Sequence, residues 1–336
     1  GATGDLQTLS VFGRDPVRPG ADRSGVIAKQ LAAIPLPNNF RAGDGLNTAG
    51  YTWSRPVIVD FSTYDFRVDH QFSSDHRLSF SHGRQGYASF NVSGPQALPA
   101  SPRGGGPNST RLYSLSVTSV LRPTLLNEFR AGVMRPRQTI LAPWEVDGTD
   151  LLARAGDYPY MLGFSLVSSP LYPAVGAEPS NRISPVYQWG DALSWSRGRH
   201  AFKGGAEVRF VSSAGYDAFV VTPRATLGQG AVGVQNINNV PNIGQNAGTA
   251  QQLLLELAGS LNGATQIFNS PGGSNPAYLP GQTRYRNWRQ REIDWFFKDD
   301  IKLRPSLTLN LGVRWEWYAT PYDPRGRTLA LEGGSG

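Results

Sequence analysis

The stretch "FKDDIKLRPSLTLNLGVRWEWY" (Phe297–Tyr318) places two runs of alternating apolar and polar residues on either side of an Arg-Pro-Ser turn. In the second run every odd position from Leu307 to Trp317 is apolar, whereas the even positions are polar or glycine. Successive side chains of a strand point to opposite faces of a sheet. The stretch therefore predicts a β-hairpin with one apolar face and one polar face.

The same pattern recurs upstream in three further hairpins. They lie at 64–80, 113–133 and 187–210, and their turns fall at Ser73–His76, at Arg122-Pro123-Thr124 and at Arg197-Gly198-Arg199. The segments "LRPTLLNEFRAG" and "LRPSLTLNLGVR" resemble each other, which indicates a loosely repeated unit. Strands of about eleven residues exceed the five or six usual in globular proteins and match the 9–11 that cross a bilayer.

Short turns alternate with long connections, at 86–110, 136–185 and 213–283, that are rich in Gly, Pro, Asn and Ser. Compact soluble domains rarely contain such connections, whereas outer-membrane barrels combine short periplasmic turns with long extracellular loops. We therefore predict an all-β fold, an antiparallel transmembrane β-barrel segment of about eight strands. The expected regions are an extracellular loop region (1–61), two β-hairpins (62–135), an extracellular loop (136–185), a β-hairpin (186–212), a long extracellular loop with a short helix (213–283), a β-hairpin (284–318) and the start of the next loop (319–336).

Two short helices are expected within the connections. The segment "GTAQQLLLELAG" predicts a helix with Thr249 as its N-cap and Gly259 as its C-terminal stop. A second helical turn is expected in "SGVIAKQLAAI".

Composition narrows the classes of function. The 336 residues include no cysteine, which excludes disulfides, thiolate metal sites and cysteine nucleophiles. No apolar run approaches the roughly 18 residues of a membrane-spanning helix. The net charge of +7 comes from scattered arginines without a basic block or nucleic-acid motif, so we expect no nucleic-acid partner. The chain starts at Gly1 without Met or signal peptide, and we expect it to be an excerpt of a longer protein.

No catalytic or metal-binding pattern is present in the sequence. The four histidines, His70, His76, His82 and His200, form no tight ligand pair, and adjacent Asp299 and Asp300 point to opposite faces of a strand. The glycine-rich segment "SPRGGGPNST" lacks the Gly-Lys-Ser/Thr of a phosphate-binding loop. We expect no enzymatic activity, no cofactor and no metal site.

The best candidate for ligand contact is "RYRNWRQRE", which places Arg284, Arg286 and Trp288 on the polar parity of a strand extended beyond the membrane. Guanidinium groups beside an indole suit anionic or carbohydrate-bearing ligands. The alternative is a positive rim that faces anionic lipopolysaccharide. Trp144, Tyr158 and Tyr160 form a weaker candidate, whose alternative role is to pack their own loop.

Aromatic residues on the apolar parity have a separate role. Trp189, Trp195, Trp315 and Trp317 are predicted to form the aromatic girdle at the membrane interfaces, and the alternative is a sugar-stacking platform. Asp299 shares this parity. We expect it to lie at a membrane boundary or beside a β-bulge that shifts the register.

Six stretches occur together in a familiar order: "IAKQLAAIPLPNN", "YDFRVDHQFSSDHRLSFSHGR", "NEFRAGVMR", "WSRGRHAFKGGAEVRF", "QQLLLELAG" and "FFKDDIKLRPSLTLNLGVRWEWYATPYDPRGR". In this order they resemble the TonB-dependent outer-membrane receptors, and in particular the Oar-like branch that carries a carboxypeptidase-regulatory-like domain. The resemblance implies a bacterial outer-membrane location and a barrel of about 22 or more strands filled by an N-terminal plug. Neither plug nor TonB box is visible in this chain.

The resemblance also implies function and partners. The expected function is uptake of a bulky ligand, a siderophore, oligosaccharide or peptide, energised by the TonB–ExbB–ExbD complex through the plug. Outer-membrane lipid and lipopolysaccharide are the other expected partners. Polar residues predicted to face the lumen and the plug are Arg67, Asp69, Lys203, Glu207, Arg209, Arg314 and Glu316. The alternatives are a non-transporting surface adhesion or structural barrel and a soluble β-rich carbohydrate-binding protein.

Overall fold

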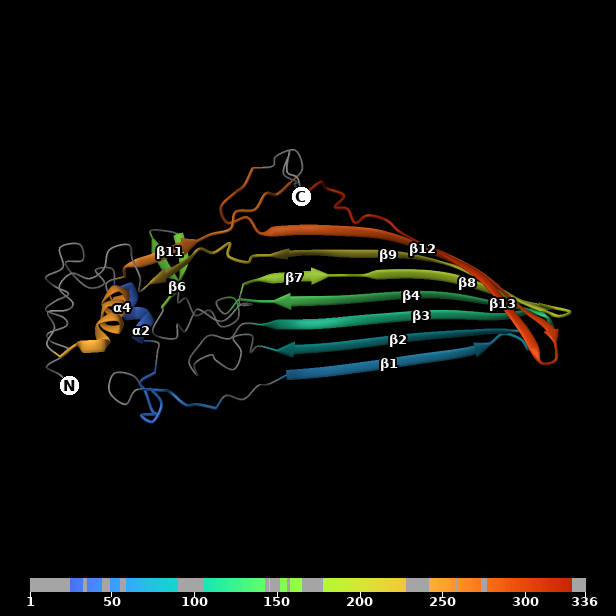
Figure 1. Cartoon of the computed structure of the whole chain (residues 1–336), viewed down its shortest axis with the longest axis horizontal. Helices are drawn as coiled ribbons and strands as arrows, with labels where there is room; N and C mark the ends of the chain where they lie inside the picture. The colour runs from blue at the N-terminus through green and yellow to red at the C-terminus, as the bar shows by residue number, and fades with distance from the viewer. Residues whose placement is uncertain are drawn as a thin grey trace.

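The computed structural model describes residues 25–32, 35–43, 49–54, 59–89, 105–142, 145, 152–155, 158–164, 178–227, 242–257, 259–272 and 277–327. Its main element is a nine-stranded antiparallel sheet (Figure 1). In chain order the strands are β1 (Val59–Gln71), β2 (His76–Ser89), β3 (Gly106–Arg122), β4 (Leu125–Ile140), β7 (Ser180–Ile183), β8 (Val186–Arg197), β9 (His200–Asp217), β12 (Arg284–Arg304) and β13 (Leu307–Tyr318). Short turns lie at one end of the sheet, and the long connections gather at the other (Figure 1).

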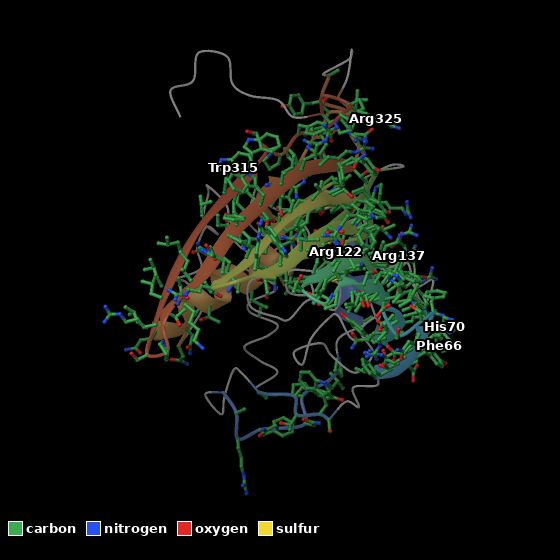
Figure 2. All side chains as sticks on the ribbon, turned by 90° about the vertical axis from the view of Figure 1, so that its right-hand side faces the viewer. Phe66, His70, Arg122, Arg137, Trp315 and Arg325 are labelled. Atoms are coloured by element: carbon green, nitrogen blue, oxygen red, sulfur yellow. The ribbon has the colours of Figure 1, made fainter. Side chains whose placement is uncertain are left out.

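Neighbouring strands pair in the order of the chain. β1 pairs with β2, β3 with β4, β8 with β9 and β12 with β13, all antiparallel. β9 and β12 also pair along their lengths, from Asp217 opposite Arg284 to His200 opposite Ile301, although a long connection separates them. The predicted antiparallel all-β fold is confirmed, and Figure 2 shows the sheet from its turn end as an open curve.

The strands are longer than the sequence predicts. β9 has 18 residues and β12 has 21, whereas about 9–11 residues cross the hydrocarbon layer. In β12 the apolar alternation covers only Ile293 to Leu303, and the residues from Arg284 to Arg291 carry the strand further. The sheet therefore continues beyond the apolar band on the side of the long connections.

The pairing register keeps like side chains on the same face. One cross-strand row joins Trp189, Val208, Ile293 and Trp317, so the apolar parities of β8, β9, β12 and β13 form one surface, here called the apolar face. Side chains such as Leu311 and Val313 are 54% and 52% exposed on it. A continuous exposed apolar surface of this kind requires a nonaqueous surrounding. The opposite surface is called the polar face.

The strand between β4 and β9 is interrupted at Ser184 and Pro185, where β7 ends and β8 begins. Proline has no N–H to donate to a ladder, and Pro136 lies opposite this break in β4. The segment nevertheless stays paired with both neighbouring strands, because Ser184 N–H donates to the Pro136 carbonyl (3.1 Å) and Ser212 N–H donates to the Pro185 carbonyl (3.0 Å). β7 thus extends the strand into the segment that the sequence assigns to a loop.

Asp299 occupies the apolar face without a bulge beside it. The register of β12 with β13 is regular through Asp299 and shifts only between Lys302 and Arg304, at the turn. Asp299 Oδ2 lies 2.6 Å from Nδ1 of His200, which directly follows the turn before β9. The bulge explanation is therefore wrong, and the position close to the turn end of the sheet fits the membrane-boundary alternative.

A second break in the alternation, Phe296, is explained by a glycine. Phe296 lies on the polar face opposite Gly205 of β9, and a Cβ atom at residue 205 would lie 2.8 Å from the Phe296 ring. The aromatic ring therefore covers the backbone that the glycine leaves bare.

The long connections contain a second, four-stranded sheet. Its order is β11 (Leu261–Thr265), β10 (Arg224–Leu227), β6 (Tyr158–Gly163) and β5 (Ala153–Ala155). Helices α2 (Val26–Ala32) and α4 (Ala247–Leu257) lie nearby (Figure 1), and Ile27, Leu162 and Leu227 form a buried cluster. These connections therefore have structure of their own.

Both predicted helices are present, with one boundary corrected. α2 lies within the segment expected to form a helical turn. α4 begins at Ala247, directly after a 3-10 turn at Gly244–Asn246, so Thr249 lies inside the helix and is not its N-cap. Gly259 follows the helix with φ of 72° and ends it as predicted. None of the helices in the described residues is both long and apolar enough to cross a membrane.

Candidate functional site

Three cross-strand rows form a compact group of polar side chains at the end of the sheet that carries the long connections. The outermost row joins Ser180, Asp217 and Arg284 on β7, β9 and β12. The middle row joins Arg182, Gly215 and Arg286. The innermost row joins Ser213 and Trp288, and the Ser213 hydroxyl lies 3.1 Å from that of Ser184.

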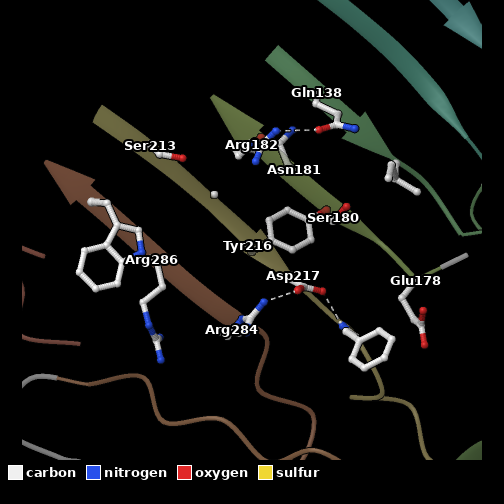
Figure 3. A pocket seen from close by; sticks show the side chains of 14 residues that line it. Gln138, Glu178, Ser180, Asn181, Arg182, Ser213, Tyr216, Asp217, Arg284 and Arg286 are labelled. Atoms are coloured by element: carbon white, nitrogen blue, oxygen red, sulfur yellow. Dashed lines mark hydrogen bonds and ion pairs between the residues drawn. The ribbon is translucent and has the colours of Figure 1, made fainter. Parts of the chain in front are cut away.

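These rows line a cavity of about 600 Å³ on the polar face (Figure 3). The cavity extends to Gln138 of β4 on one side and to Trp288 of β12 on the other. Because all of these positions share the parity of the polar face, a closed barrel would hold the cavity inside its mouth. The site lies where β7, β9 and β12 continue beyond the apolar band.

One guanidinium in the cavity is neutralised by a carboxylate. Arg284 lies 2.6 Å from Oδ2 of Asp217, whose Oδ1 accepts a hydrogen bond from the Phe219 backbone N–H at 2.8 Å (Figure 3). Asp217 is thereby fixed at the end of β9. This pair contributes no net charge to the site.

The other two guanidinium groups have neutral partners. Arg182 donates to Oε1 of Gln138 (3.3 Å), and Arg286 donates to the carbonyl of Tyr285 (2.8 Å). Within the described ranges neither arginine has a carboxylate at ion-pair distance. Burial and the neighbouring charge of Arg284 lower the pKa of Arg286, but an arginine starts so high that it remains a cation at neutral pH.

The wall of the cavity is tied to the smaller sheet by a buried ion pair. Glu178 is 5% exposed and pairs with Arg224 of β10, and it also accepts the Val220 backbone N–H at 3.3 Å. The Arg224 guanidinium lies over the Phe219 ring, 5.1 Å from its centre. The pair therefore holds the segment after β9 against the start of β7.

The predicted ligand-contact residues separate into two groups. Arg284, Arg286 and Trp288 line the cavity together. Tyr158 and Tyr160 lie in β6 of the smaller sheet and do not line the cavity, and Tyr160 packs on the buried cluster of Ile27, Leu162 and Leu227. Trp144 lies outside the described residues.

Gln138, Arg182 and Asp217 are among the lining residues that the sequence did not predict. All three lie in segments where the sequence predicts loops. The available signal is the alternation of Ser180, Arg182 and Ser184, which continues the parity of β8 upstream of Pro185. The proline ended the predicted strand at that point.

The predicted lumenal residues all lie on the polar face, and six of the seven take part in ion pairs. Arg67 contacts Asp69 at 2.7 Å, and Arg209 contacts Glu292 at 3.0 Å and Glu207 at 3.9 Å.

Arg314 and Glu316 follow the same pattern, whereas Lys203 has no carboxylate at ion-pair distance among the described residues. Arg314 contacts Glu316 at 2.5 Å and Asp294 at 3.6 Å. Lys203 is paired in register with Lys298, which contacts Asp300 at 3.1 Å. Arginines at membrane level thus have carboxylate neighbours, in contrast to Arg182 and Arg286.

The predicted girdle tryptophans all lie on the apolar face. Trp189 and Trp317 belong to one cross-strand row, and Trp295 pairs with Trp315 in the next row toward the turns. Trp195 lies nearer the turn and stacks on Phe202 with ring centres 5.4 Å apart. Their places near both ends of the apolar alternation match the positions of interfacial aromatic residues.

The segment after β13 folds back on β12, and Asp323 fixes it there. Its carboxylate accepts hydrogen bonds from the backbone N–H groups of Asn287 (2.8 Å) and Arg325 (2.9 Å) and from the Arg327 guanidinium (3.0 Å). Burial alone would raise the pKa of Asp323, but the hydrogen bonds from Arg327, Arg325 and Asn287 outweigh it and lower the pKa. This stabilisation is present above the carboxyl's unfolded pKa and is lost as the pH falls through the lower folded value.

We expect Asp323→Asn to loosen this segment at neutral pH, because the amide cannot accept all of these bonds or pair with Arg327. Tryptic cleavage after Arg325 in the full-length protein should become several times faster. Wild-type protein should show the same acceleration only at acidic pH, measured with an acid-active protease. Equal cleavage of both proteins at pH 7 would contradict this role.

In the described part of the chain, no group of three or more His, Asp and Glu side chains could hold a metal ion. The chemistry of the cavity is instead that of recognition, with two cationic forks, an indole and several neutral hydrogen-bonding groups.

Comparison with known proteins places the fold. A family described as "Outer membrane beta barrel domain" matches residues 7–334. No curated protein matches the chain. Among solved structures, the outer membrane transporter YddB from Escherichia coli is similar with a TM-score of 0.40 and 8% identity, over 78% of this chain and 27% of that one. Because the family match covers nearly the whole chain, the protein belongs to the outer-membrane β-barrel domain family and is located in the bacterial outer membrane.

Proposed function

We propose that the chain is part of the barrel of a TonB-dependent receptor of the Oar-like branch, which imports a bulky ligand across the outer membrane. Its partners are a plug domain, the TonB–ExbB–ExbD complex that acts through the plug, and the surrounding lipid and lipopolysaccharide. The observation that carries the proposal is the cavity on the polar face, lined by Arg182, Arg286 and Trp288 at the end with the long connections.

The place of this cavity favours import over surface adhesion. An adhesion barrel needs its contact residues on the tips of the loops, where a partner surface can reach them. Here Arg182, Arg286 and Trp288 belong to the polar parity of the strands, so a ligand that touches them would already be inside the barrel mouth. The ion pairs of the polar face below, such as Arg209 with Glu292, provide a hydrated surface for a plug.

The test uses the complete gene in its native host. We expect deletion of the gene to abolish growth on one bulky nutrient supplied at limiting concentration, and the full-length gene to restore it. A full-length version without a TonB box should reach the outer membrane in equal amount and should fail to restore growth. Restoration without a TonB box would overturn the proposal, and unchanged growth on every nutrient together with lost surface attachment would favour the adhesion barrel.

A further inference from the structure

We infer that the cavity recognises an acidic oligosaccharide, whose anionic group lies between Arg182 and Arg286 over Gly215 and one of whose sugar rings stacks on Trp288. This inference deepens the proposed function and rests on it, since it names the ligand class that the barrel would admit. Four features of the cavity support it.

The two arginines flank a position without a side chain. Arg182 and Arg286 are both paired in register with Gly215, on its two sides. Strands lie about 4.8 Å apart, so the two backbones are about 10 Å apart, a span that two arginine side chains can bridge. In the structure Arg182 points to Gln138 of β4 and Arg286 to the Tyr285 carbonyl, so a bound anion would draw both guanidinium groups toward Gly215. A Cβ atom at residue 215 would collide with the backbone oxygen of Asn181, so only glycine fits there. The middle row, here called the notch, therefore has an arginine on each side and no side chain between them.

Neither arginine of the notch forms an ion pair with another described residue. Arg284, one row outward, is neutralised by Asp217, and Arg209, deeper on the polar face, is neutralised by Glu292. Arg182 and Arg286 contact only an amide and a carbonyl oxygen within the described residues. Guanidinium groups bind carboxylate and sulfate oxygens through paired N–H donors, which makes an anionic group the matching occupant.

An indole and two hydroxyl groups lie one row deeper. Trp288 is 36% exposed at the cavity, and the Ser213 and Ser184 hydroxyls lie 3.1 Å apart beside it. An exposed indole face and small hydroxyl donors suit a sugar ring, which has apolar C–H faces and equatorial hydroxyls. A small free anion would bind only the two arginines and would not contact Trp288, so the indole favours a larger ligand with a sugar ring.

A second cavity extends the site sideways along the polar face. It measures about 320 Å³, shares Gln138 and Arg182 with the first, and adds Gln85, Asn108 and Thr110. Together the two cavities reach from β2 to β12, five interstrand spacings of about 4.8 Å or roughly 24 Å. Neutral hydrogen-bonding groups lie along this length, with Arg137 in the second cavity and the notch in the first, and this arrangement fits a hydroxyl-rich chain that carries acidic groups.

The test measures binding to the full-length protein, purified in detergent with its plug. The probes are tetragalacturonate, a sulfated galactose tetrasaccharide, neutral maltotetraose and sodium sulfate, titrated by calorimetry at two salt concentrations. We expect at least one acidic tetrasaccharide to bind, and to weaken as salt increases. Maltotetraose and free sulfate should bind at least tenfold more weakly. Which acidic probe binds identifies the anion as carboxylate or sulfate.

Variants locate the binding in the notch. Arg182→Gln and Arg286→Gln should each weaken the acidic probe about tenfold and reduce its salt dependence. Trp288→Ala should weaken the tetrasaccharide and keep the salt dependence. Arg289→Gln is the matched control, because Arg289 lies on the same strand three residues from Arg286 and on the opposite face. Folding of every variant is checked by its heat-dependent mobility on gels.

Three results would overturn the inference: binding of neither acidic probe, equal binding of maltotetraose, or unchanged affinity of folded Arg182→Gln and Arg286→Gln. Failure here is distinct from failure of the proposed function. TonB-box-dependent growth without binding of acidic probes would reject only the ligand class. Binding of an acidic probe without TonB-box-dependent growth would reject only the import.

Discussion

Replacement of Val313 by arginine is expected to cost about 2–4 kcal/mol of folding free energy, because it places a charge on the apolar face at membrane level. Val313 pairs with Phe297 and is 52% exposed on that face. The long side chain has no carboxylate within its row, and it lies inside the apolar alternation of β13 rather than at its ends. The expected result is a lower temperature at which the full-length barrel loses its folded gel mobility, together with less protein in the outer membrane.

The matched control is Asn310→Arg, on the same strand and the opposite face. Asn310 pairs with Asp300, so the new guanidinium would find a carboxylate in a hydrated surrounding. Its effect should stay within about 1 kcal/mol. Equal destabilisation by the two variants would mean that the two faces of β13 meet the same solvent, and would contradict the assignment of the apolar face to lipid.

The difference between the apolar and polar faces of β13 could be predicted from the sequence, because alternation with a period of two is visible in the residues themselves. β13 and the paired part of β12 extend over consecutive alternating positions, so any one-residue error of register would exchange the two faces. The turns at Gly198 and Pro305 mark where each hairpin reverses. Fold class and face assignment therefore followed from local information.

Only part of the cavity could be predicted from the sequence, because its residues come from strands that are distant in the chain. Arg284, Arg286 and Trp288 continue an unbroken alternation, and so their shared parity was visible. Arg182 joins them through pairing of β7 with β9 and of β9 with β12, and Pro185 interrupts its strand. No local pattern specifies which arginine finds a carboxylate, because the Arg284–Asp217 contact joins residues 67 positions apart.

The smaller sheet could not be predicted from the sequence either. β10 pairs with β11 on one side and, in parallel, with β6 on the other, and each of these strands has six residues or fewer. Strands this short give too few alternating positions to be distinguished from a loop. Their stability depends on contacts such as the Ile27, Leu162 and Leu227 cluster, which joins three distant segments.

Removal of the Glu178 carboxylate should strongly destabilise the contact between this smaller sheet and the cavity wall, and should leave the rest of the fold intact. Glu178 is 5% exposed and pairs with Arg224, whose side chain is 17% exposed. Removal of the carboxylate from a buried pair typically costs about 3–5 kcal/mol, and here the buried Val220 N–H loses its acceptor as well. We therefore expect Glu178→Ala to raise hydrogen exchange at Val220 and along β10 by two orders of magnitude or more.

The contrast with Asp217→Asn on the same cavity tests whether burial is the cause. Asp217 and Arg284 form a pair of similar chemistry, but their side chains are 35% and 57% exposed, and exposed pairs contribute less than about 1 kcal/mol. Asp217→Asn should therefore leave exchange in β10 close to that of the wild type. Exchange in the paired cores of β9 and β12 should stay slow in both variants, since Glu178 lies outside the ladder between them and Asp217 with Arg284 forms only its outermost pair. If both variants loosened β10 equally, the charge at the cavity rather than the burial of Glu178 would be what holds the smaller sheet in place.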